Sequence, residues 1–200
     1  MYSKSQNMII GFHGCDKSVR DDIASGKSLM KKSENDYDWL GHGSYFWIDN
    51  LQRAKYFAEE KQKRNPDIIT EPAVLGAFID LGYCLDLLDS TYLTLLKEFY
   101  TLLKETYEKQ GTILPMNQSV GSDLLLRNLD CAVIESVHTF NKDNNKQEFD
   151  SVRGVFWEGN DLYPNAGFKE KNHIQICIRN PNCIKGFFIP REFDPKFIIP

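Results

Sequence analysis

The residues of this chain best suited to bind and transform a small molecule lie in two short segments, Gly11–Cys15 and Trp39–Trp47. The first sets His13 beside a glycine, and the second joins a Gly-x-Gly turn to an aromatic run that contains Tyr45. A histidine nitrogen can bond a ligand hydroxyl, and glycine allows a ligand to approach the backbone closely. The two segments therefore predict opposite walls of one small-molecule cleft.

A third candidate segment is His173–Arg179, in which three isoleucines alternate with other residue types, His173 and Gln175 among them. Alternation with a period of two predicts a strand whose two sets of side chains point to opposite faces of a sheet. The isoleucine face is core. The other face can bond a ligand, and it follows a long loop, where sites are often built.

The elements that must position these segments belong to a chain of 200 residues, of which 42% are hydrophobic and 26% are charged. This length and composition are those of one ordinary globular domain with a proper core. The net charge of -4 lowers the expectation of a general duplex-binding surface, although a local basic patch stays compatible with it.

Targeting signals are missing from the sequence pattern. The N-terminal residues do not form a signal peptide, and no stretch approaches the roughly 18 apolar residues of a membrane span. The five cysteines are odd in number and form no Cys-x-x-Cys pair, which indicates reduced thiols rather than disulfides or a zinc site. We therefore expect a cytoplasmic protein that makes no contact with membranes.

The hydrophobic periodicity predicts an α+β order with a mixed sheet and helices inserted after the early strands. Strands are expected at residues 7–13, 44–47, 73–80, 131–137, 152–158 and 173–179, with 187–190 as an extension. Helices are expected at 18–24, 51–63, 90–109 and, as a turn or two, at 122–128. Their capping residues are expected to be Asp16 or Ser18, Asp49 or Asn50, and Ser90. Residues 138–150 and 159–171 are expected to be exposed loops, the first of them mobile.

With these pieces in place, the chain resembles the ADP-ribosyltransferase fold, in its diphtheria-toxin and poly(ADP-ribose) polymerase branch. That branch is marked by a His-Tyr-Glu triad on three separated strands. Phe12-His13-Gly14 matches its first His-Gly, Gly41–Phe46 matches its Gly-x-Gly-x-Tyr-Phe, and Arg53–Tyr56 follows at the family's distance. The motifs cover about the first sixty residues, and the final strand matches by order and alternation alone. The resemblance implies one domain over residues 1–200, with a split mixed sheet and inserted helices around an NAD cleft.

The resemblance also implies a role for each matched residue. His13 would bond the ribose that bears nicotinamide, and Gly14 would offer backbone groups to the carboxamide. Tyr45 and Tyr56 would sandwich the nicotinamide ring, which suits a cationic pyridinium. A group on the final strand would bond a ribose hydroxyl and steady the oxocarbenium-like transition state, where stabilising the developing charge yields most of the rate.

The chain departs from the family pattern at the third triad position, where the family has a Glu at the start of the last strand. His173 lies nearest that position and is expected to bind the cofactor. Gln175 shares its face and can bond a hydroxyl, but it supplies no negative charge. Glu170, in the preceding loop, supplies charge if the loop folds inward. We expect Gln175, and after it Glu170, to act with His13 and Tyr45 as catalytic residues.

The implied function is that of an NAD-consuming mono-ADP-ribosyltransferase, with NAD as co-substrate and no metal. It would release nicotinamide and attach ADP-ribose to an intracellular macromolecule, protein or nucleic acid. Compact members of this fold often serve bacteria and phages as toxins or defence effectors, which implies an antitoxin or inhibitor as a partner. Two alternatives share the fold: a module that binds NAD or ADP-ribose without transfer, and an RNA 2′-phosphotransferase, for which the chain shows few basic and His residues.

Other chemistries have weaker signals. Cys15 and His13 are spaced for a Cys–His nucleophile, and a metal site from these two and His173 has no recognised ligand spacing. Glu158 ends a strand and is expected to border the cleft beside a packing Trp157. There is no Gly-x-x-x-x-Gly-Lys phosphate loop, so the NAD diphosphate would depend on scattered cations. The candidates are Arg20, Lys27, Lys31 and Lys32.

Overall fold

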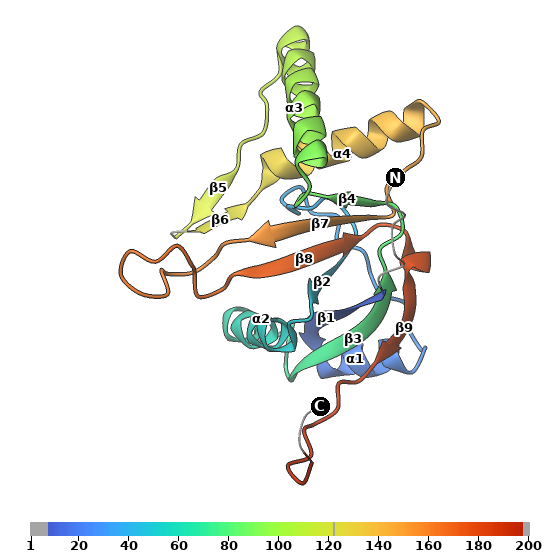
Figure 1. The fold of residues 1–200 in the computed structure, drawn as a ribbon, viewed down its shortest axis with the longest axis vertical. Helices are drawn as coiled ribbons and strands as arrows, with labels where there is room; N and C mark the ends of the chain where they lie inside the picture. The colour runs from blue at the N-terminus through green and yellow to red at the C-terminus, as the bar shows by residue number, and fades with distance from the viewer. Residues whose placement is uncertain (1–7, 122, 198–200) are drawn as a thin grey trace.

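The computed structural model describes residues 8–121 and 123–197 of the chain. Its elements, in chain order, are β1 Met8–Asp16, α1 Lys17–Ala24, β2 Ser44–Ile48, α2 Leu51–Arg64, β3 Pro72–Asp80, β4 Cys84–Asp86, α3 Ser90–Gln110, β5 Gln118–Val120, β6 Asp123–Leu126, α4 Asn128–Asp143, β7 Ser151–Phe156, β8 His173–Ile178 and β9 Ile184–Phe188. The fold is α+β, as expected, with a mixed sheet of seven strands in the order β4-β7-β8-β2-β1-β3-β9 (Figure 1). Asn7 and Ser122, expected in a strand and a helix, lie outside the described residues.

The centre of the sheet holds the three strands that the sequence marked as chemical. β1 pairs with β2, and β2 pairs with β8, both antiparallel. The sheet is mixed because β4 and β7 are parallel. Segments near the two ends of the chain thus become neighbours, with Phe12 opposite Trp47 and Trp47 opposite Gln175.

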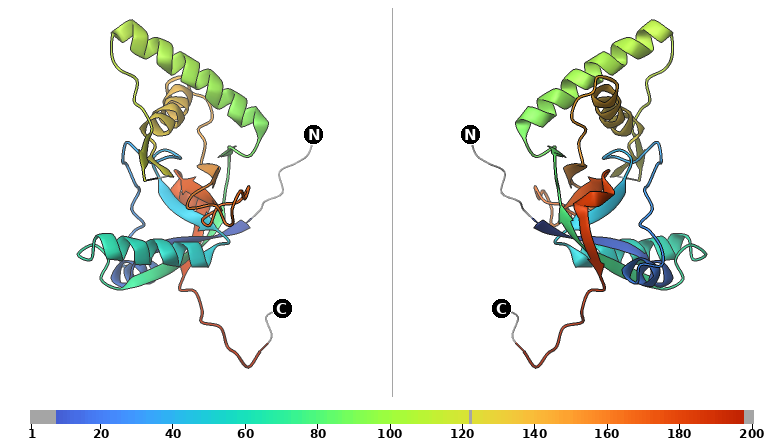
Figure 2. Two further views of the ribbon diagram at one scale, coloured as in Figure 1. Left: turned by 90° about the vertical axis from the view of Figure 1, so that its left-hand side faces the viewer. Right: turned by 90° about the vertical axis from the view of Figure 1, so that its right-hand side faces the viewer.

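The helices are divided between two ends of the molecule. α1 and α2 lie beside β1 and β3, whereas α3 packs with α4 at the other end (Figures 1 and 2). The side-chain oxygens of Asp16 and Asn50 accept hydrogen bonds from Ser18 N and Arg53 N, each at 2.9 Å, and so cap the first turns of α1 and α2. Both caps are among those predicted. α3 is capped by Asp89 rather than Ser90.

Close packing of α2 on β1 depends on small residues. Ala54 and Ala58 of α2 are fully buried, and a Cβ at Gly14 would overlap the carbonyl oxygen of Ala54. The glycine at 14 is therefore required where the helix meets the strand. At Gly14 the backbone of β1 therefore packs directly against the inner face of α2.

The main hydrophobic core supports the turn that precedes β2. Leu40 and Cys177 are fully buried in one cluster with residues of α3, α4 and β7. Burying one such leucine contributes about 1.5–3 kcal/mol. The Gly41 turn and β8 are thereby anchored to the same core.

Residues 131–137 form part of α4 and not the predicted strand. The buried residues Cys131, Ile134, Val137 and His138 recur at helical spacing on its inner face. β-branched residues favoured the strand prediction, and packing against α3 overrides that preference. The prediction of an exposed loop from 138 is wrong up to Asp143, and residues 123–126 pair with β5 instead of forming a helical turn.

Among the described residues, no helix is long and apolar enough to cross a membrane.

Candidate functional site

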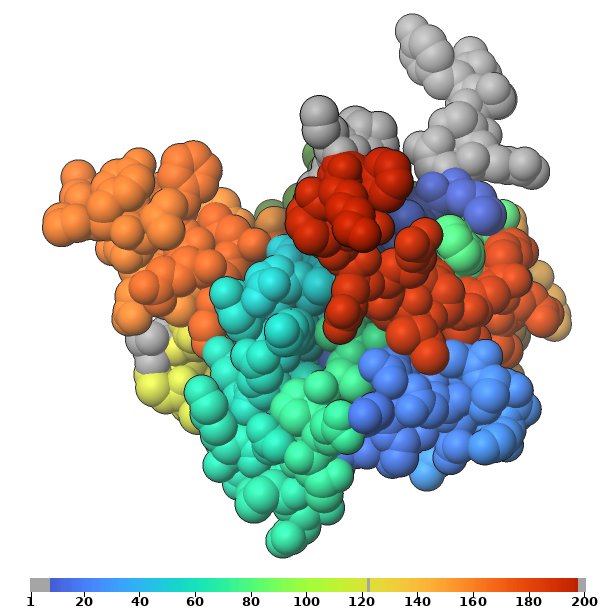
Figure 3. Space-filling model, turned by 90° about the horizontal axis from the view of Figure 1, so that it is seen from below, coloured from blue at the N-terminus to red at the C-terminus, as the bar shows by residue number. Residues whose placement is uncertain are grey.

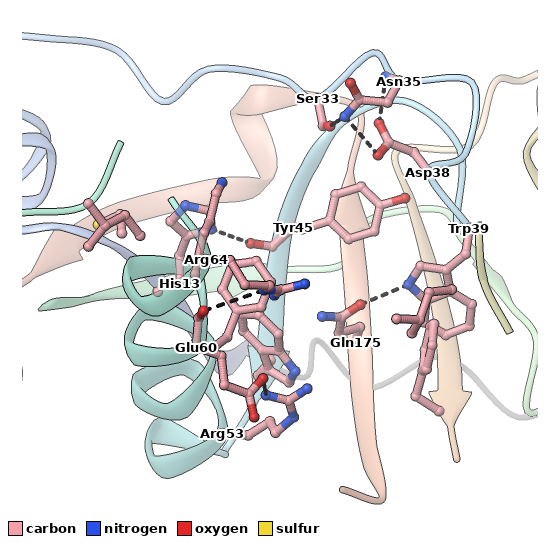
Figure 4. Close-up of a pocket in the computed structure, with 18 of the residues that line it drawn as sticks. His13, Ser33, Asn35, Asp38, Trp39, Tyr45, Arg53, Glu60, Arg64 and Gln175 are labelled. Atoms are coloured by element: carbon pink, nitrogen blue, oxygen red, sulfur yellow. Dashed lines mark hydrogen bonds and ion pairs between the residues drawn. The ribbon is translucent and has the colours of Figure 1, made fainter. Parts of the chain in front are cut away.

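A cleft of about 1010 Å³ is lined by residues from β1, β2, β8 and α2, and by the segments that flank them. Its sheet wall is formed by β1, β2 and β8. The segments of His13 and Tyr45, expected on opposite walls, therefore lie side by side on this one wall. Its helix–loop wall is formed by α2 together with Glu158 and Lys171, at the two ends of the loop that follows β7. Figure 4 shows Tyr45 and Gln175 on the strands and Arg53, Glu60 and Arg64 on the helix that faces them. Ligand pockets commonly measure roughly 300–1,000 Å³, so the cleft has room for a ligand as large as a dinucleotide.

The cleft brings together most of the residues singled out from the sequence. These are His13, Gly14, Tyr45, His173 and Gln175, with Lys31 as the only lining member of the four diphosphate candidates. Tyr56 and Glu170 are not among the lining residues, and neither are Arg20, Lys27 and Lys32.

His13 is held by the strand next to it. Its Nδ1 lies 2.8 Å from the carbonyl oxygen of Tyr45 and donates to it, which leaves Nε2 as an acceptor. Burial lowers the pKa of His13, with an opposing contribution from this hydrogen bond. Nε2 bonds to none of the described residues, so the neutral ring can accept a hydrogen bond there from a ligand hydroxyl.

Tyr45 fixes the Gly-x-Gly turn through its hydroxyl. The hydroxyl donates to the carbonyl of Gly41 at 2.7 Å and accepts from Leu40 N at 3.0 Å. Gly41 has a φ of +75°, and a Cβ on Gly43 would lie 2.5 Å from the sulfur of Cys177. The two glycines are thus explained by backbone conformation and packing, while the ring of Tyr45 remains as a lining surface of the cleft.

Gln175 presents a donor to the cleft because its acceptor is occupied. Its Oε1 accepts from Trp39 Nε1 at 2.8 Å, and its Nε2 donates to none of the described residues. The residue is 9% exposed. Trp39 therefore orients Gln175 in the cleft. The sequence analysis includes Trp39 in the Trp39–Trp47 segment but predicts no role for it.

His173 is a structural member of the sheet wall. Its Nδ1 donates to the carbonyl of Lys171 at 2.6 Å, and its ring stacks on Phe156 with centroids 5.3 Å apart. Burial lowers the pKa of His173 to about 4, so the ring is neutral at pH 7.

Tyr56 cannot form the predicted aromatic sandwich with Tyr45. It is 51% exposed, because successive residues of a helix point about 100° apart and its neighbour Phe57 takes the lining position. Phe57 packs against Trp47 with ring centroids 5.0 Å apart. These two rings supply aromatic surface where the sequence had assigned Tyr56.

Glu170 lies on the surface of its loop and not in the cleft. Its Oε2 accepts from the backbone and side-chain nitrogens of Asn160, at 3.3 and 3.2 Å. These bonds turn the carboxylate toward the loop itself. The expected inward folding of this residue is not seen.

One carboxylate that does line the cleft is that of Glu158. Its Oε2 lies 3.1 Å from Nη2 of Arg53, and its side chain is 13% exposed. Burial raises the pKa of Glu158, against the effect of Arg53. Arg53 is itself buried, with its guanidinium 5.6 Å from the ring of Trp47. The sequence analysis expects Glu158 to border the cleft because of its position at the end of a predicted strand.

The structure gives no support to a Cys–His nucleophile formed by Cys15 and His13. All five cysteines are free and buried, and burial raises the pKa of Cys15 to about 11. A thiol rather than a thiolate therefore stands near His13. Within the described ranges, no group of three His, Cys, Asp or Glu residues is arranged to hold a metal ion.

Comparison with known proteins yields one informative match. The chain is 25% identical over 193 residues to the uncharacterized protein MJ0359 of Methanocaldococcus jannaschii, covering 87% of this chain and 83% of that protein. No family model and no solved structure matches the chain. The match spans most of both chains, and the name of the relative states no activity.

Proposed function

We propose that the protein is an NAD-dependent mono-ADP-ribosyltransferase with an ADP-ribosyltransferase-like fold. It would release nicotinamide and transfer ADP-ribose to an intracellular macromolecule. The observation that carries the proposal is the meeting of His13, Tyr45 and Gln175 in one cleft from the adjacent strands β1, β2 and β8. The sequence resemblance assigns His13 and Tyr45 to the first two triad positions and leaves the third among Gln175, Glu170 and His173, with Gln175 slightly favoured.

The free hydrogen-bonding groups suit a ribose. Nε2 of His13 is an acceptor for one hydroxyl, and Nε2 of Gln175 is a donor toward the oxygen of another. The face of Tyr45 suits the cationic nicotinamide ring. As the bond between the ribose carbon and nicotinamide breaks, its electrons neutralise the pyridinium nitrogen and positive charge develops on the ribose. Groups held in place before the reaction stabilise such charge without reorganising.

The second candidate is a module of the same fold that binds NAD or ADP-ribose without transferring it. It is favoured by a specific observation: Gln175 is uncharged, and Glu170 points away from the cleft. Under this alternative the hydrogen-bonding groups of the sheet wall serve recognition alone.

Nicotinamide release from NAD separates the two candidates. The wild-type protein should release nicotinamide, and His13→Ala and Tyr45→Ala should each lower the rate by about 100-fold. Tyr56→Ala is the matched control, because it removes an exposed tyrosine from α2. Tight NAD binding without release, with every acceptor tried, would establish the binding module instead.

Radiolabelled NAD incubated with a total cell extract addresses the acceptor. Label removed by protease identifies a protein acceptor, and label removed by nuclease identifies a nucleic acid. An antitoxin partner and a role as a toxin or defence effector belong to the same proposal. They are tested by expressing the protein and its His13→Ala variant in cells and comparing growth.

A further inference from the structure

The cleft contains a carboxylate that the triad does not use. Glu158 lies two residues beyond the end of β7, lines the cleft and is mostly buried. Its Oε2 is held by Arg53, while its Oε1 accepts no hydrogen bond from the described residues. One oxygen is thus fixed in place and the other is available to a ligand.

The register of the sheet separates Glu158 from the ribose-binding groups. Gly154 lies opposite Gln175 and Phe156 opposite His173, and Lys171 N donates to the carbonyl of Glu158 at 3.0 Å. Glu158 therefore stands beside Lys171, four residues from Gln175, or about 13 Å along the strand. Glu158 and Gln175 therefore approach a bound molecule from separate places along the cleft.

Glu158 also stands at the base of a loop with exposed apolar side chains. Between Glu158 and Lys171 the large exposed side chains are Leu162, Tyr163 and Phe168. Trp157, which directly precedes Glu158, is 59% exposed and is not the packing residue expected from the sequence. Figure 3 shows this loop, in orange, projecting from the body of the molecule beside α2. Exposed apolar side chains gathered in this way suit contact with a macromolecule.

We infer that Glu158 is the general base that activates the acceptor, a role that rests on the proposed function. The acceptor atom forms its bond to the ribose carbon as the bond from that carbon to nicotinamide breaks. The electrons of the broken bond leave with nicotinamide as a neutral molecule. The proton of the acceptor passes to Oε1 of Glu158, so atoms and charges balance.

The surroundings of Glu158 favour a base. Burial and the carboxylate of Asp123 raise its pKa, whereas the cations of Arg53 and Lys171 lower it, and burial is the largest effect. A carboxylate with a raised pKa accepts a proton more readily. Arg53 acts here as a positioning residue, because its guanidinium holds Oε2 of Glu158 in place.

The test compares Glu158→Gln with Glu170→Gln, a matched change in the same loop. The measured quantity is the ratio of radiolabelled ADP-ribose attached to components of a total cell extract to nicotinamide released. Glu158→Gln should lower this ratio by about tenfold or more and leave KM for NAD nearly unchanged, whereas Glu170→Gln should keep the wild-type ratio. In Glu158→Ala, added formate should restore part of the ratio, which a merely structural carboxylate would not allow.

Each other outcome has a defined meaning. A wild-type ratio in Glu158→Gln, or equal losses of release and transfer, overturns the base role and leaves the proposed function standing. A wild-type protein that releases no nicotinamide overturns both. If Glu158→Gln does not fold, Arg53→Met with Glu158→Met replaces the pair by apolar side chains of similar length, and a retained ratio again overturns the role.

Discussion

The two walls of the cleft hold their polar groups in different ways. On the sheet wall, His13, His173 and Tyr45 bond to backbone atoms, and Gln175 bonds to Trp39. On the helix–loop wall, charged side chains of α2 pair with charged side chains at the two ends of the loop. These four side chains of the sheet wall are uncharged and fixed by their neighbours, whereas the other wall depends on ion pairs. This contrast suggests a division of labour, with recognition of the cofactor on the sheet and handling of the acceptor on the helix and loop.

The largest effect is expected where the two walls touch. Gly14→Ala places a Cβ against the carbonyl oxygen of Ala54. The backbones of β1 and α2 are both fixed here by their own hydrogen bonds, so neither can move away to relieve the overlap. We expect a loss of about 3 kcal/mol in the free energy of unfolding, measured by urea titration. Gly186→Ala is the control, because nothing lies within 4 Å of its added Cβ. Equal stability of the two variants would mean that α2 does not pack on β1 as described.

The neutral ring of His173 predicts that the free energy of unfolding depends on pH. Its folded pKa of about 4 lies below the ordinary value of 6.5, so as the pH falls below 6.5 the unfolded chain binds a proton that the folded chain does not. Stability is therefore lost between about pH 6.5 and pH 4. At pH 5 the loss from this residue is about 2 kcal/mol.

The variant His173→Phe tests this contribution because it keeps a ring to stack on Phe156 and cannot titrate. The stability advantage of the wild type over the variant should shrink by about 2 kcal/mol between pH 7 and pH 5, in urea titrations at each pH. A constant difference between the two proteins would show that the ring is solvated and charged in the folded state.

A smaller effect is expected from the bond that orients Gln175. Trp39→Phe removes the indole N–H and leaves Oε1 of Gln175 without its donor, at a cost of about 1–2 kcal/mol. The amide is then free to turn, so nicotinamide release should fall more than the affinity for NAD. Trp157→Phe changes an exposed indole and should alter neither. Unchanged release by Trp39→Phe would remove Gln175 from the reaction.

Much of the sheet wall could be predicted from the sequence, because its signals are local. The His-Gly pair, the Gly-x-Gly turn and the alternation from His173 each describe a few adjacent residues. The helix–loop wall could not be predicted in this way. The rotation of α2 decides that Phe57 and not Tyr56 faces the cleft, and the pairing of Arg53 with Glu158 joins residues 105 positions apart. For a related reason the sequence predicts a strand in the buried run from Cys131, since only the contact of this run with α3 decides in favour of a helix.

The smallest stability effect is expected at the ion pair that ties the far end of the loop to α2. Glu60 and Lys171 lie 2.8 Å apart with more than a third of each side chain exposed, and such a pair contributes about 0.5 kcal/mol or less. Glu60→Gln should therefore leave the free energy of unfolding nearly unchanged. It should still loosen the loop, because the tie at Lys171 is lost while the one at Glu158 remains. Limited proteolysis should then cut within residues 159–170 faster than in the wild type, and Glu59→Gln, one position away on α2, should not. If cleavage of the two variants is equal, the ion pair does not hold the loop, and the helix–loop wall is as firmly fixed as the sheet wall.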